Sequence, residues 1–501
     1  MPVYTRFLDP PISTPRLDAR TRRLLEAPLG PTLLRLAAPN VAVMLVQASV
    51  GLIETYFIGK LGTDALAGVS LVFPLLMLMQ MMSAGAMGGG ISSAIARALG
   101  AGRRADADAL AVHALAIAVL FGAVFSMALL IGGRALYAVL GGAGASLGAA
   151  LTYSDLLFAG AILVWLFNSL ASVLRGTGNM WFPAMVTIAG AAVLIPVSPA
   201  LIFGWGPIPR VGIAGGAQAL LTYYAVGSAV FLGYLLRGRS VVRLSLHGRL
   251  LRWALFRDIL RVGAVAALVT VGTNLLIAIS TGLVGQFGQA AIAGYGAGSR
   301  LEYLLVPLVF GLGAPLVAIV GTCMGAGDRQ RALHAAWLGA AVAGGMSELI
   351  GLAAAAAPHA WLSLFDSDPA MLDAGTRYLH AVGPAYGLFG VGMALYFASQ
   401  GAGRLLWPLC ANVVRLVIAA AGGWLLLRYT GELSLVFVAQ AVALVAFGLI
   451  NAAGVARGAW DERVRGAPAH GAPATPAPVT PTPATPAPVT PAPVTPAPST
   501  E

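Results

Sequence analysis

The sequence predicts an all-α polytopic membrane protein with 12 transmembrane helices in two parallel-repeat six-helix bundles. Three observations predict this class: an apolar composition, long apolar runs and an internal repeat. Charged residues make up 10% of the 501 residues, hydrophobic residues make up 58%, and the mean hydropathy is +0.84. An ordinary soluble domain has roughly 25% charged residues. Because so few polar side chains cannot cover a soluble protein of this size, lipid must surround most of the chain.

Twelve apolar runs are long enough to cross the membrane, since a hydrocarbon core about 30 Å thick requires about 20 helical residues. The backbone must satisfy its own hydrogen bonds in lipid, and no run alternates with the period of a strand, so each run is expected to be a helix. The first run begins too late and is too long for a cleaved signal peptide. The expected spans are 32–58, 65–96, 107–132, 150–173, 181–204, 211–236, 258–284, 290–320, 331–354, 378–399, 405–427 and 433–455.

Composition divides the whole chain into five parts. We expect a cytoplasmic lead-in at 1–31, a first lobe at 32–236, a basic cytoplasmic linker at 237–257, a second lobe at 258–455, and a disordered tail at 456–501. The tail repeats Pro, Ala, Thr and Val, a composition that cannot bury a hydrophobic core. We therefore assign the tail no part in transport.

The basic residues are distributed unevenly between the two sides of the membrane. An even number of spans places both termini on one side, and most of the 30 Lys and Arg residues fall in the termini and loops of that side. By the positive-inside rule, both termini are expected in the cytoplasm and the protein in the cell (inner) membrane. The net charge of +11 thus indicates topology and no nucleic-acid partner. The opposite side holds Lys60, Arg134, Arg210, Arg377 and Arg428.

Three pairs of segments recur in the same order at an offset of 225 or 226 residues. Six helices in each half insert both halves the same way round, so the repeats are parallel, with an axis along the membrane normal. Two facing bundles of this kind are suited to alternating access. The matched segments are IGKLGTDALAG (58–68) with VGQFGQAAIAG (284–294), ALGAGRR (98–104) with CMGAGDR (323–329), and RGTGNMWFP (175–183) with QGAGRLLWP (400–408).

The same segments resemble the bacterial type of the MATE (multidrug and toxic compound extrusion) family of efflux transporters. Members are antiporters that expel cationic, amphipathic compounds in exchange for H+ or Na+. The resemblance therefore implies a small-molecule substrate and no cofactor other than the coupling ion. It is carried by VGLIETYFIGKLGTDALAGVSLVFPLL (50–76), SSAIARALGAGRRADA (92–107), LRGTGNMWFP (174–183), ALIFGWGPIPRVGIAGGA (200–217), GQFGQAAIAGYGAGSRLEYLLVPLVFGLG (285–313) and GTCMGAGDRQRA (321–332).

A polar stripe runs along the first expected span, where Asn40, Gln47 and Glu54 recur every seven residues. This spacing keeps the three side chains on one helix face, and an ionisable residue inside a span is a functional candidate. The resemblance implies that Glu54, at a position usually occupied by Asp, binds the coupling cation. We expect Gln47 and Asn40, which share its helix face, to belong to the same cation-coupling site. The alternative is that Glu54 is an interfacial carboxylate wetted near Lys60.

Two departures from the family pattern bear on the coupling ion. In the fifth span the family often has Asn and Asp where this chain has Leu194 and Ser198. Some members carry a seventh-span carboxylate where this chain has Thr273 beside Asn274. A sodium site with several carboxylates is therefore hard to assemble, which favours H+ over Na+.

A second polar group is expected in the second lobe, formed by Arg300, Glu302, Asn274 and Arg415. Arg300 and Glu302 are two positions apart and point to different helix faces, so we expect Glu302 to find its partner in Arg415. This network either stabilises the second lobe or contributes to coupling. Four further residues are candidates for a substrate cavity that stacks on a flat cation, or for an ordinary aromatic interior. These are Trp165, Asn168, Tyr386 and Phe389.

Several other functions are excluded or disfavoured. Lys60 is the single lysine and is followed by Leu61, so no phosphate-binding loop exists and the chain is not an ATP-driven pump on its own. Cys323 and Cys410 both fall in expected helices and offer no metal knuckle or disulfide framework. We expect a transporter and no enzyme, working as a monomer among membrane lipids. A flippase for lipid-linked precursors or polysaccharides is the alternative, and a membrane-embedded enzyme is a weaker one.

Overall fold

The computed structural model of the chain describes residues 17–207, 209–244 and 251–461. Every regular element in these ranges is a helix, and no strand occurs among them. Eleven helices there are long and apolar enough to cross a membrane, or 12 if one bent pair forms a single span. The predicted all-α fold with two six-helix bundles is confirmed. The predicted Pro-rich tail lies almost entirely outside the described residues.

The first half contains six spans, two of which are interrupted. A π-helical turn, η1 (Met81–Met87), divides the second span, and the fourth bends by 50° at Gly160. A short helix, α1 (Ala19–Glu26), precedes them, and Asp18 caps its N-terminus. The spans are α2 (Leu29–Gly59), α3 (Thr63–Gln80) with α4 (Gly88–Gly100), α5 (Arg104–Val139), α6 (Gly144–Ala159) with α7 (Ala161–Gly176), α8 (Trp181–Phe203) and α9 (Ile213–Leu236).

The second half repeats this order with its own interruptions. The expected span at 290–320 is divided, because α11 ends at Ser299 and α12 begins at Glu302. The last turns before this break are rich in glycine, which has low helix propensity. The elements are α10 (Trp253–Gly285), α11 (Gln289–Ser299), α12 (Glu302–Gly325), α13 (Arg329–Ala356), α14 (Pro358–Leu362), α15 (Pro369–Val382), η2 (Gly383–Ala385), α16 (Tyr386–Ala402), α17 (Leu406–Val417), η3 (Ile418–Gly422), α18 (Gly423–Thr430) and α19 (Leu433–Ala456).

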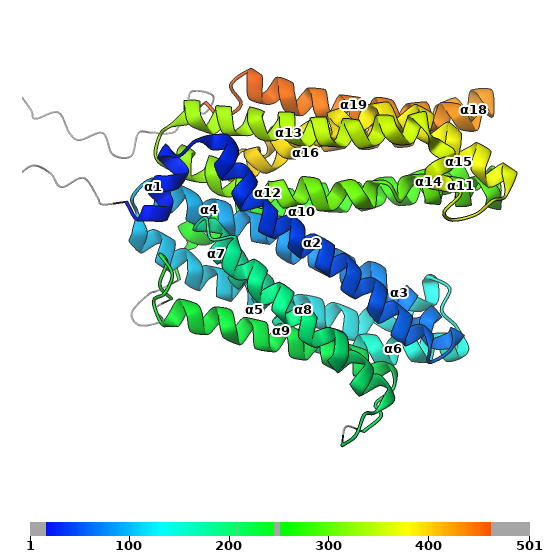
Figure 1. The fold of residues 1–501 in the computed structure, drawn as a ribbon, viewed down its shortest axis with the longest axis horizontal. Coiled ribbons are helices and arrows are strands. Elements are labelled where there is room, and N and C mark those ends of the chain that lie inside the picture. Colours follow the sequence, from blue (N-terminus) through cyan, green and yellow to red (C-terminus); the bar gives the residue numbers. More distant parts are fainter. Residues whose placement is uncertain (1–16, 208, 245–250, 462–501) are drawn as a thin grey trace, which may run out of the picture. The chain divides into compact units, whose positions relative to one another are not determined.

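Equivalent helices of the two halves make equivalent contacts. α5 packs on α7 as α13 packs on α16, and α3 packs on α6 as α11 packs on α15. Figure 1 shows α5 to α9 gathered in one layer of helices and α13, α16 and α19 in another. The first helix of each half also crosses to the other half, since α2 packs on α12 and α10 packs on α4. The repeat seen in the sequence is therefore a repeat of helix packing.

The turns between helices repeat as well. Gly102 follows α4 with a φ of +72°, and Gly327 follows α12 with a φ of +79°. A positive φ is readily adopted only by glycine, which ends a helix at this position without steric strain. The two glycines belong to the matched segments 98–104 and 323–329, so the same turn closes the second span of each half.

Candidate functional site

A carboxylate lies inside the first half, at Glu54 in the last two turns of α2. Its Oε1 atom is shut off from solvent and has no hydrogen-bond partner among the described residues. The Tyr153 hydroxyl of α6 is in hydrogen-bond contact with the carboxylate. Gly216 of α9 leaves room for it, because a Cβ placed there would stand 3.3 Å from Oε1. Three helices thus surround a carboxylate whose hydrogen-bonding capacity is only partly used.

A chain of polar side chains continues from this carboxylate toward the centre of the first half. Tyr224 of α9 lies within electrostatic reach of Glu54, and its hydroxyl accepts a hydrogen bond from Nε2 of Gln80. Asn168 of α7 donates to Oε1 of Gln80 at 3.1 Å and to Oγ of Ser83 at 2.8 Å. Ser83 belongs to the π-helical turn η1, and such turns are frequent at functional sites.

The other two residues of the predicted stripe do not join Glu54. Asn40 is buried, and its Nδ2 donates to Sδ of Met180 at 3.8 Å. Gln47 is exposed. At 1.5 Å per residue, Asn40 is about 21 Å from Glu54 along the helix. The polar neighbours that the structure gives Glu54 are Tyr153 of α6 and Tyr224 of α9, which both belong to other helices.

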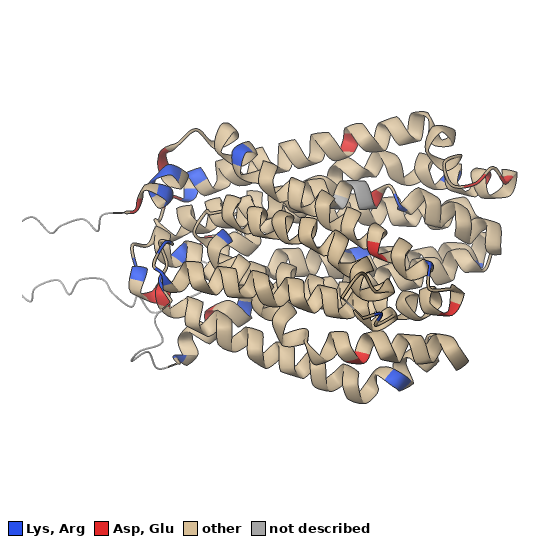
Figure 2. Ribbon diagram, turned by 60° about the horizontal axis from the view of Figure 1, so that its bottom comes forward, with Lys and Arg blue, Asp and Glu red and all other residues tan. Residues whose placement is uncertain are grey.

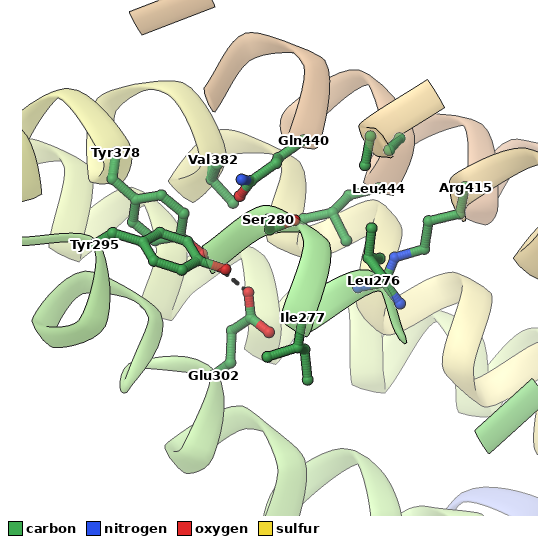
Figure 3. A pocket seen from close by; sticks show the side chains of 12 residues that line it. Leu276, Ile277, Ser280, Tyr295, Glu302, Tyr378, Val382, Arg415, Gln440 and Leu444 are labelled. Carbon is green, nitrogen blue, oxygen red and sulfur yellow. Dashed lines mark hydrogen bonds between the residues drawn. The ribbon is translucent and has the colours of Figure 1, made fainter. Parts of the chain in front are cut away.

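The second half contains a small polar cavity of about 40 Å³. Glu302, at the start of α12, accepts a hydrogen bond from the Tyr378 hydroxyl at 3.0 Å. The Tyr378 hydroxyl also lies 3.3 Å from that of Tyr386. Figure 3 shows Glu302 and Tyr378 meeting at one end of the cavity. The lining residues come from α10, α11, α12, α15, α17, η3 and α19, and are Leu276, Ile277, Ser280, Tyr295, Glu302, Tyr378, Val382, Arg415, Ala419, Gln440, Ala443 and Leu444.

Arg415 lines the same cavity from α17 but does not touch Glu302. The residue is 7% exposed, and its guanidinium lies 5.3 Å from the Phe389 ring centre and 5.5 Å from that of Phe447. Figure 3 shows Arg415 on the far side of the cavity, with Leu276 between it and Glu302. The structure brings the predicted partners into one cavity, where they interact electrostatically across a gap.

The two remaining members of the predicted network lie elsewhere. Arg300 is exposed, and its guanidinium lies 5.2 Å from the Phe365 ring centre. Asn274 is exposed as well and donates to the carbonyl oxygen of Thr270, one turn earlier in α10, at 2.9 Å. Neither residue lines the cavity of the second half.

The four predicted substrate-cavity residues are buried and divided between the halves. Trp165 is inaccessible to solvent and stacks on Phe121 with ring centres 5.4 Å apart. Asn168 belongs to the polar chain of the first half, whereas Tyr386 and Phe389 pack next to the cavity of the second half. No pocket described in the structure is lined by residues of both pairs.

Sequence reasoning missed the tyrosines. Tyr153, Tyr224 and Tyr378 supply polar contacts of the two carboxylates, but their positions in the sequence do not show that these hydroxyls face an acid on another helix. One signal was present in the sequence: Tyr153 and Tyr378 differ by 225, the offset of the internal repeat. A tyrosine retained at equivalent positions of both halves indicates an equivalent role.

Comparison with known sequences places both halves within one family pattern. A sequence profile described as MatE matches residues 39–200 and 266–425. The FAD transporter of Shewanella oneidensis is 30% identical over 397 residues, which are 79% of this chain and 87% of that protein. A Thermotoga maritima protein named "Probable multidrug resistance protein NorM" is 24% identical over 383 residues, 76% of this chain and 82% of that protein.

Comparison with solved structures shows the same fold. A MOP superfamily transporter from Pyrococcus furiosus superimposes with a TM-score of 0.79 at 24% sequence identity, covering 88% of this chain and 98% of that chain. The outward-facing conformation of a multidrug resistance MATE family transporter superimposes with a TM-score of 0.78 at 23% identity, over the same shares of both chains. These superpositions establish the arrangement of the helices.

Proposed function

Since the chain belongs to the MatE family of multi-pass membrane transporters, we propose that it is a secondary-active antiporter that exports small organic compounds in exchange for H+. The observation that carries this proposal is Glu54, whose carboxylate lies inside a spanning bundle with an unused acceptor atom. Ionisable groups in such positions are costly and typically lie on ion and proton pathways. The proposed coupling residue is therefore Glu54.

Coupling follows from a difference in proton affinity between two states. A charged carboxylate buried away from water is unfavourable, so the arrangement in which Oε1 is sealed favours the protonated form. When α2 moves apart from α6 and α9 and water reaches Glu54, the charged form becomes hydrated and the proton leaves. A ligand shifts an equilibrium only by its differential affinity for the two states, and the proton has such a difference here. Each cycle then exchanges an inward proton for an outward substrate.

The surroundings of Glu54 favour H+ over Na+. The positions where the family often has Asn and Asp are Leu194 and Ser198, which are both buried in α8. A hard cation prefers several oxygen ligands, whereas the neighbours of the carboxylate are tyrosine hydroxyls. A proton needs one acceptor only.

Two classes of compound are candidates for the substrate. Family resemblance favours cationic, amphipathic compounds. The identity to a protein named FAD transporter favours a flavin dinucleotide, an aromatic anion, as a second candidate. The two are opposite in charge, so competition between a fluorescent cation and FAD for transport separates them.

We also propose that both termini face the cytoplasm and that the protein lies in the cell (inner) membrane as a monomer. Figure 2 shows Lys and Arg gathered at the end of the helices where α1 lies. The positive-inside rule assigns such an end to the cytoplasm.

The experiment that tests the proposed function is transport in everted vesicles. Uptake of a fluorescent cation, and separately of FAD, is measured with either a pH gradient or a sodium gradient as the only driving force. We expect uptake to follow the pH gradient. Uptake driven by sodium alone, or uptake that continues without either gradient, would contradict the proposal.

A further inference from the structure

At the end of the bundle where basic residues gather, one side chain of the first half is bound to two helices of the second half. Nη2 of Arg97, in the last turn of α4, lies 2.8 Å from Oδ1 of Asp258 in α10. Nη1 of the same residue donates to the carbonyl oxygen of Gly401 in α16 at 3.2 Å. The Arg97 side chain is 16% exposed and that of Asp258 is 44% exposed.

Neighbouring polar contacts join the same helices. The Ser93 hydroxyl, one turn before Arg97, donates to the carbonyl oxygen of Gln400 at 2.5 Å. The Gln400 side chain donates in the opposite direction, from Nε2 to the carbonyl oxygen of Gly85 at 3.2 Å. Gly85 belongs to η1, where the π-helical turn alters the usual backbone pairing. Both halves thus exchange hydrogen bonds around Arg97.

The second half does not contain equivalents of the residues that form these contacts. At the repeat offset of 225, Thr322 is the equivalent of Arg97 and Ala318 is the equivalent of Ser93. Neither replacement can form an ion pair. A second ion pair also joins the two parts: Nη2 of Arg252, the residue before α10, lies 2.7 Å from Oδ1 of Asp106 in α5, and 54% of the Arg252 side chain is exposed. Arg97 is the more buried of the two arginines, and its contact joins the halves at one end through residues that the repeat does not duplicate.

We propose that Arg97 is a gating residue, whose ion pair with Asp258 keeps the basic end closed and must break each time that end opens. Transporters built from two repeats expose their substrate site alternately by rocking one repeat against the other. Rocking that opens the basic end pulls α4 and η1 away from α10 and α16, and this movement breaks the contacts described above. The inference rests on the proposed transport function.

The test measures the distance between the halves at this end, without substrate or ion gradient. Spin labels are attached to cysteines placed at Arg104 and Gln330, exposed residues near the start of α5 and α13. The background carries Cys323→Ser and Cys410→Ser, which removes both native cysteines. Pulsed electron paramagnetic resonance on the protein in lipid nanodiscs then gives the populations of short and long distances between the two spin labels. Because this distance measurement needs no transport, it can still test the gating proposal if the protein turns out not to export substrate in exchange for protons.

We expect Arg97→Gln to raise the ratio of long to short distances about fivefold, the effect of losing one partly exposed ion pair. Asp258→Asn removes the ion pair alone and should produce most of that shift. The two substitutions together should exceed Arg97→Gln by little, because the ion pair is already lost in that variant. The exchange Arg97→Asp with Asp258→Arg should restore much of the short distance. Arg377→Gln, which breaks an ion pair with Asp373 inside α15, is the matched control and should change nothing.

Two outcomes would overturn the proposal. One is a distance distribution that is unchanged in both Arg97→Gln and Asp258→Asn, with normal elution from size exclusion. The other is full additivity of the two substitutions, which would show that each side chain acts through a separate contact. If Arg97→Gln does not fold, Asp258→Asn alone decides, since its side chain is more exposed and differs from Asp by one atom.

Discussion

Tyr153 and Tyr378 occupy equivalent positions in the two halves, and each hydroxyl contacts a carboxylate within the membrane. The residues differ by 225, the offset of the sequence repeat. Tyr153 contacts Glu54, and Tyr378 donates to Glu302 at 3.0 Å. The carboxylates themselves do not follow the repeat, because Glu54 lies in α2 and Glu302 in α12. Each half therefore combines a tyrosine that the repeat duplicates with a carboxylate that it does not duplicate.

The first prediction concerns these tyrosines. Tyr153→Phe removes the hydroxyl that contacts the proposed coupling carboxylate, and a hydrogen bond to a charged group contributes about 1.5–3 kcal/mol. We expect proton-driven export to fall about tenfold while insertion and folding stay normal. Tyr378→Phe, the equivalent change in the second half, should reduce export much less. Equal losses in both variants, measured in the same vesicle assay, would assign coupling to both halves.

The second prediction concerns the crossing of α4 and α12. A Cβ at Gly100 would stand 2.0 Å from the carbonyl oxygen of Thr322, and one at Gly325 would stand 2.1 Å from that of Arg97. Since backbone atoms cannot move aside cheaply, Gly100→Ala should lower stability by about 1–3 kcal/mol. Gly132→Ala in α5, where no atom lies within 4 Å, is the control. Thermal unfolding in detergent measures both, and an unchanged melting temperature for Gly100→Ala would mean that the halves are further apart.

Much of this fold could be predicted from the sequence, because the fold depends on local signals. Apolar runs predict the spans, and the repeated segments predict that Gly100 and Gly325 are equivalent. Each of the two glycines then lies close to the backbone of the other helix, Gly100 to Thr322 and Gly325 to Arg97. The first and last residues of an apolar run do not show whether the run forms one helix or two. The break between Ser299 and Glu302 lies inside the expected span 290–320. Glycines precede it and Arg300 lies within it, but neither feature showed that the helix is divided there.

The candidate site was harder to predict, for a physical reason. Spacing along one helix shows which residues share a face, but it does not show which other helix that face meets. Asn40 and Gln47 share the periodicity of Glu54, yet its polar neighbours come from other helices. Sequence distance likewise cannot separate Arg415, which reaches the cavity, from Arg300, which stacks on an exposed aromatic ring.

The third prediction concerns the charge in the second half. Arg415→Met removes a buried cation and leaves Glu302 without its electrostatic partner across the cavity. Removing one member of a buried charge pair typically costs about 3–5 kcal/mol. We expect a large loss of thermal stability in detergent, which Glu302→Gln in the same chain should partly restore. Arg300→Gln, at an exposed position, should leave stability within about 0.5 kcal/mol of the parent. Wild-type stability of Arg415→Met would show that the cavity is well hydrated.

The fourth prediction concerns topology. Cysteines introduced at Arg103, Arg243 and Arg329 should resist an impermeant thiol reagent added to intact cells, because the basic end is assigned to the cytoplasm. Cysteines at Arg210 and Arg377 should react. The background lacks Cys323 and Cys410, so that only the introduced thiols report. Labelling of the first group from outside would reverse the assigned orientation.

The measurement that tests the central claim most directly is proton-driven export by Glu54→Gln, with Glu302→Gln as its counterpart in the second half. Glutamine retains the size and most hydrogen bonding of the side chain but cannot release a proton. We predict that Glu54→Gln inserts normally, still binds substrate and loses gradient-driven export, and that Glu54→Asp retains part of it. Export by Glu54→Gln at the wild-type rate, together with loss of coupling in a well-expressed Glu302→Gln, would place the proton path in the second half and contradict this account.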